Sequence, residues 1–477
     1  MTTTARTDAV VVGAGPNGLA AAVALARQGF RVTVLEAADE PGGGTRSTDQ
    51  LTIPGVVHDR CSAVHPLAAA SPFLRSLPLE RHGLTWCHPE VAVAHPLDDG
   101  TAPVVLRDLD ATVGGLGDDG HVWRRLFAGP SRRFDRLAAD LLGPVVRVPR
   151  HLRTTTPVGV SALLPATAIA RRFRRPAARA LFGGIAAHAI QPLHRPLTSA
   201  VALVMTAAGH AHGWPVARGG SQAIATSLVS LLEELGGTVE CGVRVTSLRD
   251  LPRSRVALLD LGPRQLAEIA GDALPDRARE HYASWPHGPA VFKVDYALAG
   301  GVPWTAPLAR RAGTVHVIGA FEEIVEAEQA VHAGRMPDRP YMIAAQQYLA
   351  DPDRAVDEIV PFWVYAHVPH GYDGDATPAI EAQLERFAPG FRERVVARHV
   401  TTPADLEAYN PCYVGGDIAG GATDPWRLVA RPRFAPDPYA TGVPGLFLCS
   451  ASTPPGAGAH GMCGYHAARS ALRVLTA

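Results

Sequence analysis

The feature that most constrains the fold is a glycine loop near the N-terminus, Gly13-Ala14-Gly15-Pro16-Asn17-Gly18, which has the pattern G-x-G-x-x-G. It follows the apolar residues 10–12 and opens an alanine-rich segment of helical character. In such a loop Gly13 permits a tight turn, Gly15 lets a pyrophosphate approach the backbone, and Gly18 lets helix and strand pack closely. The start of the helix, at Pro16 and Asn17, presents N–H groups and a positive dipole end to phosphates. The loop therefore predicts a dinucleotide-binding α/β unit.

An acidic residue at the end of the next predicted strand completes this unit. Glu36, followed by Ala37, lies about 20 residues after the loop, where a carboxylate accepts a hydrogen bond from a ribose hydroxyl. A carboxylate at this position also repels a 2′-phosphate, so NADP is disfavoured as the ligand.

A second glycine turn favours FAD over NAD. The run Gly42-Gly43-Gly44-Thr45-Arg46 comes a few residues after Glu36. Gly43 and Gly44 let the chain pass close to a long pyrophosphate, and Thr45 leads to Arg46, which supplies a cation to it. The alternative is a solvated glycine turn with a surface arginine.

The C-terminal loop, residues 452–462, indicates where the flavin ring lies. It is poor in large side chains and leads into a predicted helix that begins at about Met462. The start of a helix can present N–H groups to the N1/O2 edge of the flavin, where negative charge gathers on reduction. We therefore assign Ser452, His460, Gly461 and Met462 to the cofactor site.

The chain is long enough, at 477 residues, for two or three domains. Regular α/β patterns, including a short strand over 256–261, alternate with two long insertions of different character. We expect an α/β fold in which a discontinuous Rossmann-like FAD-binding domain is joined to an α+β substrate-binding domain of mixed sheet and helices. The first domain comprises residues 1–70, 215–284 and 435–477, and the second comprises residues 71–214 and 285–434.

Composition excludes several other classes. The formal net charge of +0 gives no electrostatic reason to expect a nucleic-acid partner. The six cysteines contain no C-x-x-C pair, which argues against a disulfide framework, a dithiol redox centre and a zinc ribbon. Residues 1–7 are too short and polar for a signal peptide, and no run of ~18 residues is apolar and free of charge. We expect a cytoplasmic protein with no obligate protein partner.

Arginines between Arg124 and Arg179 flank the apolar run 158–170. They are interpreted either as a patch that contacts a membrane surface, through which a lipophilic substrate enters, or as a solvated face of the substrate domain. The solvated face is favoured, and peripheral membrane contact stays an alternative.

Several of these motifs resemble those of a known superfamily. Residues 10–18, 36 and 42–46 resemble the FAD-binding head of the phytoene desaturase, carotenoid isomerase and monoamine oxidase superfamily, and residues 445–464 resemble its C-terminal flavin motif. The chain is most similar to bacterial phytoene-dehydrogenase-related proteins, a branch that includes the animal pyridine nucleotide-disulphide oxidoreductase domain-containing protein 2. The stretches that carry this similarity are residues 213–222, 291–298, 385–391 and 410–417.

The resemblance implies FAD bound along the interface of a Rossmann-like domain and a substrate domain. It also implies that the backbone of Val245 meets the adenine. The region between Thr246 and Val256 is short, so the small β-meander often found there is trimmed or absent. Because C-x-x-C is missing, disulfide reduction is not expected.

Three residues are candidates for catalysis. Lys293 and the following Pro303-Trp304 resemble a strand of amine oxidases whose lysine holds a water at flavin N5, although an ion pair with Asp295 is the alternative. His460 stabilises reduced flavin or caps its turn. His188 lies in an apolar helix predicted over 181–190 and lines a pocket or belongs to the core. His210 and His212 form H-x-H, but further metal ligands are not evident, so no metal is predicted.

The leading hypothesis is an FAD-dependent oxidoreductase that dehydrogenates a lipophilic, unsaturated or prenyl-type small molecule by hydride transfer to flavin N5. The alternatives are a redox-neutral double-bond isomerase, an amine oxidase and a flavin-bound scaffold protein without turnover.

Overall fold

The computed structural model describes residues 7–144 and 149–477, so residues 1–6, on which the signal-peptide expectation rests, lie outside it. Its first sheet is parallel, with five strands in the order β16-β10-β1-β2-β9. These strands are β1 (Ala9–Val12), β2 (Val32–Leu35), β9 (Thr238–Glu240), β10 (Val256–Leu259) and β16 (Leu446–Leu448). Three segments far apart in the sequence thus form one sheet, which confirms the Rossmann-like α/β fold.

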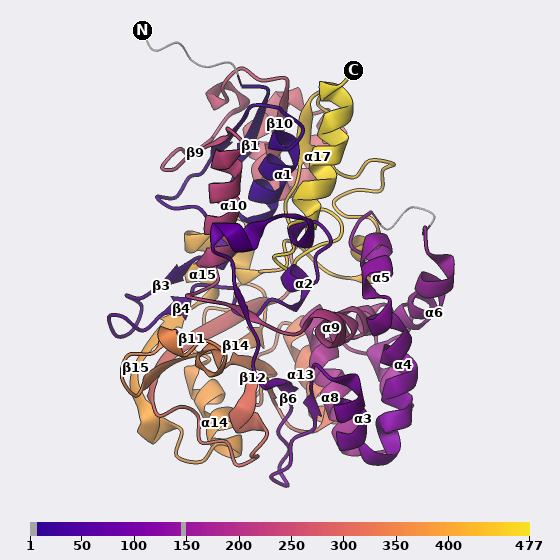
Figure 1. The fold of residues 1–477 in the computed structure, drawn as a ribbon, viewed down its shortest axis with the longest axis vertical. Helices are drawn as coiled ribbons and strands as arrows, with labels where there is room; N and C mark the ends of the chain where they lie inside the picture. The colour runs from indigo at the N-terminus through magenta and orange to yellow at the C-terminus, as the bar shows by residue number, and fades with distance from the viewer. Residues whose placement is uncertain (1–6, 145–148) are drawn as a thin grey trace.

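Helices cover both faces of this sheet. On one face α1 (Pro16–Ala26) packs against α10 (Gln222–Glu234) and α17 (Met462–Leu475), near the top of Figure 1. The other face is covered by α11 (Pro263–Ala270) and α12 (Asp276–Ala283), whose apolar side chains share a buried cluster with β1 and β10. The strand expected over 256–261 is shorter than predicted, because the chain turns after Leu259 and Pro263 starts α11.

The second sheet is mixed and has seven strands in the order β15-β11-β14-β13-β12-β6-β7. They are β6 (Val91–Ala94), β7 (Val104–Val105), β11 (Ala290–Ala299), β12 (Ala312–Val317), β13 (Met342–Ala345), β14 (Ile359–Val368) and β15 (Val395–Thr401). One face is apolar and packs on α14 (Thr377–Phe387) through Ile380, Leu384 and Phe387. Since side chains alternate along a strand, the polar residues of these strands gather on the opposite face.

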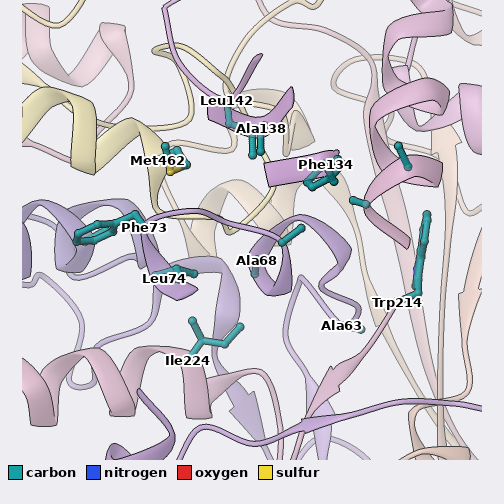
Figure 2. Close-up of a cluster of buried hydrophobic side chains, with 14 of the residues drawn as sticks. Ala63, Ala68, Phe73, Leu74, Phe134, Ala138, Leu142, Trp214, Ile224 and Met462 are labelled. Atoms are coloured by element: carbon teal, nitrogen blue, oxygen red, sulfur yellow. The ribbon is translucent and has the colours of Figure 1, made fainter. Parts of the chain in front are cut away.

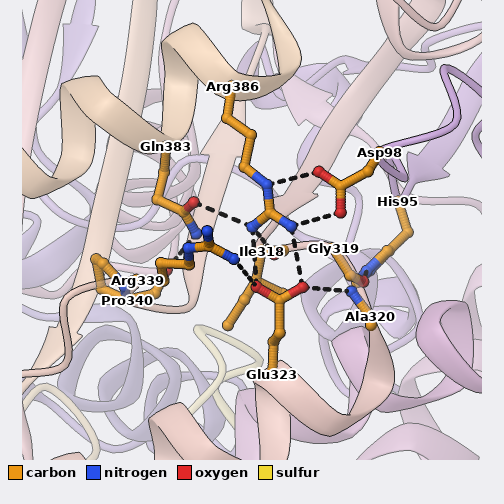
Figure 3. A network of polar contacts seen from close by, with 10 residues as sticks. All are labelled: His95, Asp98, Ile318, Gly319, Ala320, Glu323, Arg339, Pro340, Gln383 and Arg386. Carbon is orange, nitrogen blue, oxygen red and sulfur yellow. Dashed lines mark hydrogen bonds and ion pairs between the residues drawn. The ribbon is translucent and has the colours of Figure 1, made fainter.

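A network of ion pairs ties α14 to α13 (Phe321–His332) and to the loop after β6 (Figure 3). Arg386 donates two hydrogen bonds to the Glu323 carboxylate, at 2.9 and 3.0 Å, and also pairs with Asp98. Burial opposes ionisation of Glu323, but its hydrogen bonds to Arg386 lower the pKa of that carboxyl below its usual value. The network therefore stabilises one edge of the second sheet.

Helices α3 to α9 pack on one another, with α3 to α6 at the right of Figure 1 and α8 and α9 nearer its middle. They are α3 (Leu109–Gly115), α4 (Gly120–Arg132), α5 (Phe134–Leu141), α6 (Leu152–Ala162), α7 (Ala166–Ala170), α8 (Pro176–Ala186) and α9 (Thr198–His212). The helix predicted over 181–190 is wrong at its C-terminal end. The α-helix α8 stops at Ala186, a 3-10 turn follows, and Ile190 adopts a left-handed conformation with φ 50°.

Together, helices α3 to α9 join the first sheet through a buried apolar cluster (Figure 2). Phe134 and Ala138 of α5, Met462 of α17 and Ala68 of α2 (Pro66–Ala69) all belong to this cluster. The remaining short elements are β3 (Ser47–Thr48) with β4 (His58–Asp59), β5 (Trp86–Cys87) with β8 (Val216–Ala217), α15 (Pro403–Tyr409) and α16 (Pro425–Val429). The residue boundaries proposed for the two domains stay predictions.

Candidate functional site

The glycine loop joins the end of β1 to the start of α1. Gly15 is the N-cap of α1, Pro16 occupies its first turn, and the Asn17 side chain is buried. Gly18 has no room for a side chain, because a Cβ there would lie 2.0 Å from the Gly13 carbonyl oxygen. The geometry is that of a loop that leaves the N-terminus of a helix open to phosphate.

The second glycine turn lies directly against the first. A Cβ on Gly43 would be 3.1 Å from the Gly15 Cα, and the Gly42 N–H donates to the Ala14 carbonyl at 2.8 Å. The Thr45 hydroxyl donates to the Gly42 carbonyl at 2.8 Å, which closes the turn. The two turns that the sequence assigned to one pyrophosphate are therefore neighbours in space.

Glu36 and Arg46 bind each other between these turns. The Glu36 carboxylate accepts hydrogen bonds from the backbone N–H groups of Ala14 and Ala38, at 2.7 and 2.9 Å, and from Arg46 Nη2 at 3.1 Å. Glu36 and Arg46 are 8% and 6% exposed, whereas the intervening Ala37 is exposed. The Arg46 charge is thus balanced by a protein carboxylate, which the sequence did not indicate.

The C-terminal loop meets α1 at the start of α17. His460 is 1% exposed, and its Nδ1 accepts the Met462 N–H at 3.1 Å, so the imidazole caps this turn. Burial lowers the pKa of His460 to about 4, which leaves the ring neutral at pH 7. Gly461 is the left-handed N-cap of α17, with φ 68°. The Met462 side chain packs in the apolar cluster of Figure 2.

Two further predicted cofactor residues lie at the edges of this region. The Ser452 hydroxyl donates to the Gly420 carbonyl at 2.8 Å. Val245 is 8% exposed and belongs to the apolar cluster below the first sheet. The connection after it contains a short 3-10 turn, Leu248–Asp250, before β10 begins. The cofactor roles of both residues stay predictions.

Asp260 is a site residue that the sequence reasoning missed. It follows β10 directly, and its Oδ2 accepts the Gly18 N–H at 2.8 Å. A Cβ on Gly15 would be 2.7 Å from the same oxygen, so the carboxyl group lies inside the glycine loop. The sequence could have indicated Asp260, because it stands at the carboxyl end of a strand beside β1, and sheets of this kind bind nucleotides at that edge.

These elements fit an extended dinucleotide. Two buried polar atoms lack a hydrogen-bond partner among the described residues: Asn17 Oδ1 in α1 and Gln222 Oε1 beside Gly42. Buried polar atoms are rarely left unpaired, so such atoms mark positions where a ligand or water binds. Asn17 belongs to the glycine loop that the sequence assigned to the cofactor, and Gln222 lies beside the second glycine turn.

Lys293 lies on β11, on the polar face of the second sheet. It is 2% exposed and forms an ion pair with Asp295, which alternation places on the same face. Burial opposes ionisation of Asp295, but the nearby Lys293 charge and the hydrogen bond from His58 lower the pKa of its carboxyl. Trp304, which accompanied Lys293 in the amine oxidase resemblance, is buried in the apolar cluster on the opposite face.

Histidines occupy the same polar face. His188 Nε2 lies 2.9 Å from His316 Nε2 of β12, and His367 of β14 shares a 2.6 Å hydrogen bond with Glu328. Burial lowers the pKa of His188 to about 3 and that of His95 to about 4, and it holds the pKa of His316 well below the usual value. These three imidazoles are therefore neutral at pH 7. The structure brings Lys293 and His188 to one face of one sheet, and it places His460 at the first sheet.

Unpartnered polar atoms also gather on this face. Within the described part of the chain no hydrogen-bond partner is present for His95 Nδ1, His316 Nδ1, His367 Nε2 or Trp363 Nε1. His95 Nδ1 and His316 Nδ1 converge on Gly184 of α8, where a Cβ would lie 2.7 and 2.6 Å from them. This face can therefore accept or donate hydrogen bonds, but its neutral imidazoles supply no charge.

His210 and His212 point to different partners. His210 Nε2 accepts a hydrogen bond from the indole N–H of Trp123 at 3.0 Å, and His212 lies 3.0 Å from Asp135. Across residues 7–144 and 149–477, no group of three or more His, Cys, Asp or Glu side chains could hold a metal ion.

The fold and these loops define an oxidoreductase with a Rossmann-like dinucleotide-binding domain. Residues 11–77 match the family described as an NAD(P)-binding Rossmann-like domain. The chain is 28% identical to the hydroxyneurosporene desaturase of Rhodobacter capsulatus, with 98% of each chain covered. It is also 40% identical to pyridine nucleotide-disulfide oxidoreductase domain-containing protein 2 of Mus musculus, over a stretch that covers 19% of this chain and 16% of the mouse protein.

A solved structure of putrescine oxidase shares the fold, with a TM-score of 0.59, 16% identity and 99% of each chain covered. The resemblance to the superfamily of desaturases and amine oxidases is therefore confirmed. No helix within the described residues is both long and apolar enough to span a bilayer.

Proposed function

We propose that the chain binds FAD and dehydrogenates a neutral, lipophilic, unsaturated small molecule of the isoprenoid type. The observation that carries the proposal is the end-to-end similarity to hydroxyneurosporene desaturase, with 98% of both chains aligned. When bound, FAD supplies the acceptor for hydride removed from a C–H bond. The residues that would hold it are those of the two glycine turns, Glu36 and the start of α17.

The polar face of the second sheet supports a substrate that carries a neutral oxygen. The neutral rings of His95, His188 and His316 offer hydrogen bonds to a hydroxyl or carbonyl group. A carboxylate placed there would be desolvated without a cation from these rings, which is costly. We propose that this face holds the oxygen-bearing end of the substrate and so orients the bond that loses hydrogen.

The test is anaerobic reduction of the flavin. The protein loaded with FAD is mixed with hydroxylated and unhydroxylated polyenes, and the visible absorbance of oxidised flavin is followed. The proposal expects bleaching with a stoichiometric new double bond in the product, and faster bleaching with the hydroxylated compound. If no isoprenoid bleaches a fully loaded flavin, dehydrogenation of this substrate class is wrong. Turnover that requires prior flavin reduction and leaves the redox state of the substrate unchanged would instead establish isomerisation.

Amine oxidation is the second candidate, favoured by the surroundings of Lys293. Its Nζ lies 5.9 Å from the Trp363 ring centre, and the Trp363 and Tyr365 rings meet at 84° with centres 4.9 Å apart. Against it, Lys293 is bound to Asp295. Hydrogen peroxide released with amines, and lost in Lys293→Met with the flavin retained, would favour this candidate over dehydrogenation of polyenes.

We also propose that α6 contacts a membrane surface. Leu152, Val160 and Leu163 of α6 and its C-cap are 54%, 60% and 62% exposed. The surrounding sequence from residue 141 to 232 contains arginines but neither Asp nor Glu. Exposed apolar side chains among cations are typical of a helix that lies on an anionic lipid surface.

A further inference from the structure

The carboxyl group of Asp260 occupies the place where a helix N-terminus would receive phosphate. Its Oδ2 accepts the Gly18 N–H at 2.8 Å, in the first turn of α1. Asp260 is half-buried, and it lies against Gly13, Gly15 and Gly18 of the glycine loop. Because N–H groups at such a helix start bind anions, the Asp260 carboxylate and a cofactor diphosphate compete for the same positive end of α1.

The charges around Asp260 do not offset a second anion. The charged group that acts on it is the Glu36 carboxylate, which is itself negative. Arg46, the cation at the second glycine turn, already pairs with Glu36 at 3.1 Å. A diphosphate that enters this region therefore meets two protein carboxylates and one arginine, and one negative charge has to be removed for the group to be held well.

The other titratable groups that face Asp260 are thiols. Cys412 comes from the loop after α15, Cys449 from the end of β16, and Cys463 from the first turn of α17. Burial raises the pKa of Cys412 and of Cys463 to about 12 and that of Cys449 well above its usual value. The thiols are therefore neutral, and Asp260 is the group that changes charge near pH 7, because burial raises the pKa of its carboxyl to about 7.

We propose that Asp260 binds the diphosphate of the dinucleotide as a protonated acid, so that loading of the cofactor takes up one proton. The proposal rests on FAD binding as proposed above. In the cofactor-free protein the carboxylate is held by the N–H of Gly18. When the diphosphate binds, the acid form removes one negative charge and supplies an O–H donor. Asp260 is thereby a cofactor-binding residue, although it lies outside every glycine motif.

The experiment measures FAD affinity against pH. The cofactor-free protein is titrated with FAD between about pH 6 and 9, a range that brackets the pKa expected for Asp260. Above pH 7 the dissociation constant of the wild-type protein should rise by about tenfold per pH unit, the limit for uptake of one proton. Asp260→Asn, which keeps the shape and the acceptor but cannot ionise, should bind with an affinity that changes little with pH and exceeds that of the wild type at the alkaline end.

A control variant and a second readout keep the test decisive. Glu381→Gln removes a carboxylate on α14, on the far side of the second sheet, and should retain the wild-type pH dependence. Calorimetry of the wild type in buffers of different ionisation enthalpy counts the proton directly, and it does not depend on whether Asp260→Asn folds. Equal pH dependence in the wild type and Asp260→Asn, or binding at alkaline pH without proton uptake, would overturn the role of Asp260. Absence of FAD binding at every pH would overturn the proposed function instead.

Discussion

The contact between α1 and α17 allows a sharp test, because the addition of a single methyl group should push these two helices apart. Gly464 lies in α17, and a Cβ there would be 1.7 Å from the Asn17 carbonyl oxygen and 2.9 Å from the Ala21 N atom. Both are backbone atoms of α1, so no side-chain rotation can relieve the overlap. We therefore expect Gly464→Ala to push the helices apart.

The magnitude follows from two opposing effects. Alanine in a helix interior is favoured over glycine by about 1 kcal/mol. Overpacking in a close-packed interior costs about 1–3 kcal/mol, and contact with backbone places this site at the upper end. The net expectation is a loss of about 2 kcal/mol in the free energy of unfolding. FAD affinity should fall as well, since Asn17 and Met462 lie at the helix ends that are proposed to hold the cofactor.

The assay is urea unfolding of the cofactor-free protein followed by circular dichroism, together with FAD titration. Gly159→Ala in α6 is the matched control, because a Cβ there meets no atom within 4 Å among the described residues. It should raise the unfolding midpoint slightly or leave it unchanged. If Gly464→Ala were as stable as Gly159→Ala, the close packing of α1 on α17 would be wrong.

Three further predictions concern other parts of the molecule. Folding raises the pKa of the Asp260 carboxyl from 3.8 to about 7, so the protonated group stabilises the cofactor-free protein below pH 4. About 4 kcal/mol of that stability is lost as the pH rises through 7. This pH dependence should disappear in Asp260→Asn when unfolding is measured at each pH. Arg386→Gln should lower the free energy of unfolding by roughly 2–3 kcal/mol, because the substitution leaves Glu323 without its bidentate partner. In the same denaturation assay Arg279→Gln, which breaks ion pairs with exposed acids, should change the free energy of unfolding little. Leu163→Asp should reduce sedimentation with vesicles rich in phosphatidylserine while the melting temperature stays unchanged, and equal sedimentation would exclude α6 as the contact.

Local sequence was sufficient for the parts of the site that depend on backbone geometry. The strand, the G-x-G-x-x-G loop and α1 were predicted because each is specified by adjacent residues, and the structure has them at residues 9–12, 13–18 and 16–26. The second glycine turn was assigned to the same ligand, and it does lie against the first. The Lys293–Asp295 pair followed from strand alternation alone.

Other features depended on which strands become neighbours, and this is decided by the tertiary structure. Asp260 is far from Gly18 in the sequence, and only the parallel pairing of β10 with β1 brings its carboxyl group into the loop. Arg46, which the sequence assigns to a phosphate, pairs with Glu36, and its role toward a phosphate stays a prediction. His188 and His316 belong to separate insertions, and they meet because the 3-10 turn after α8 lies on the polar face of the second sheet. Contacts of this kind arise from packing between distant segments, which a local sequence pattern does not specify.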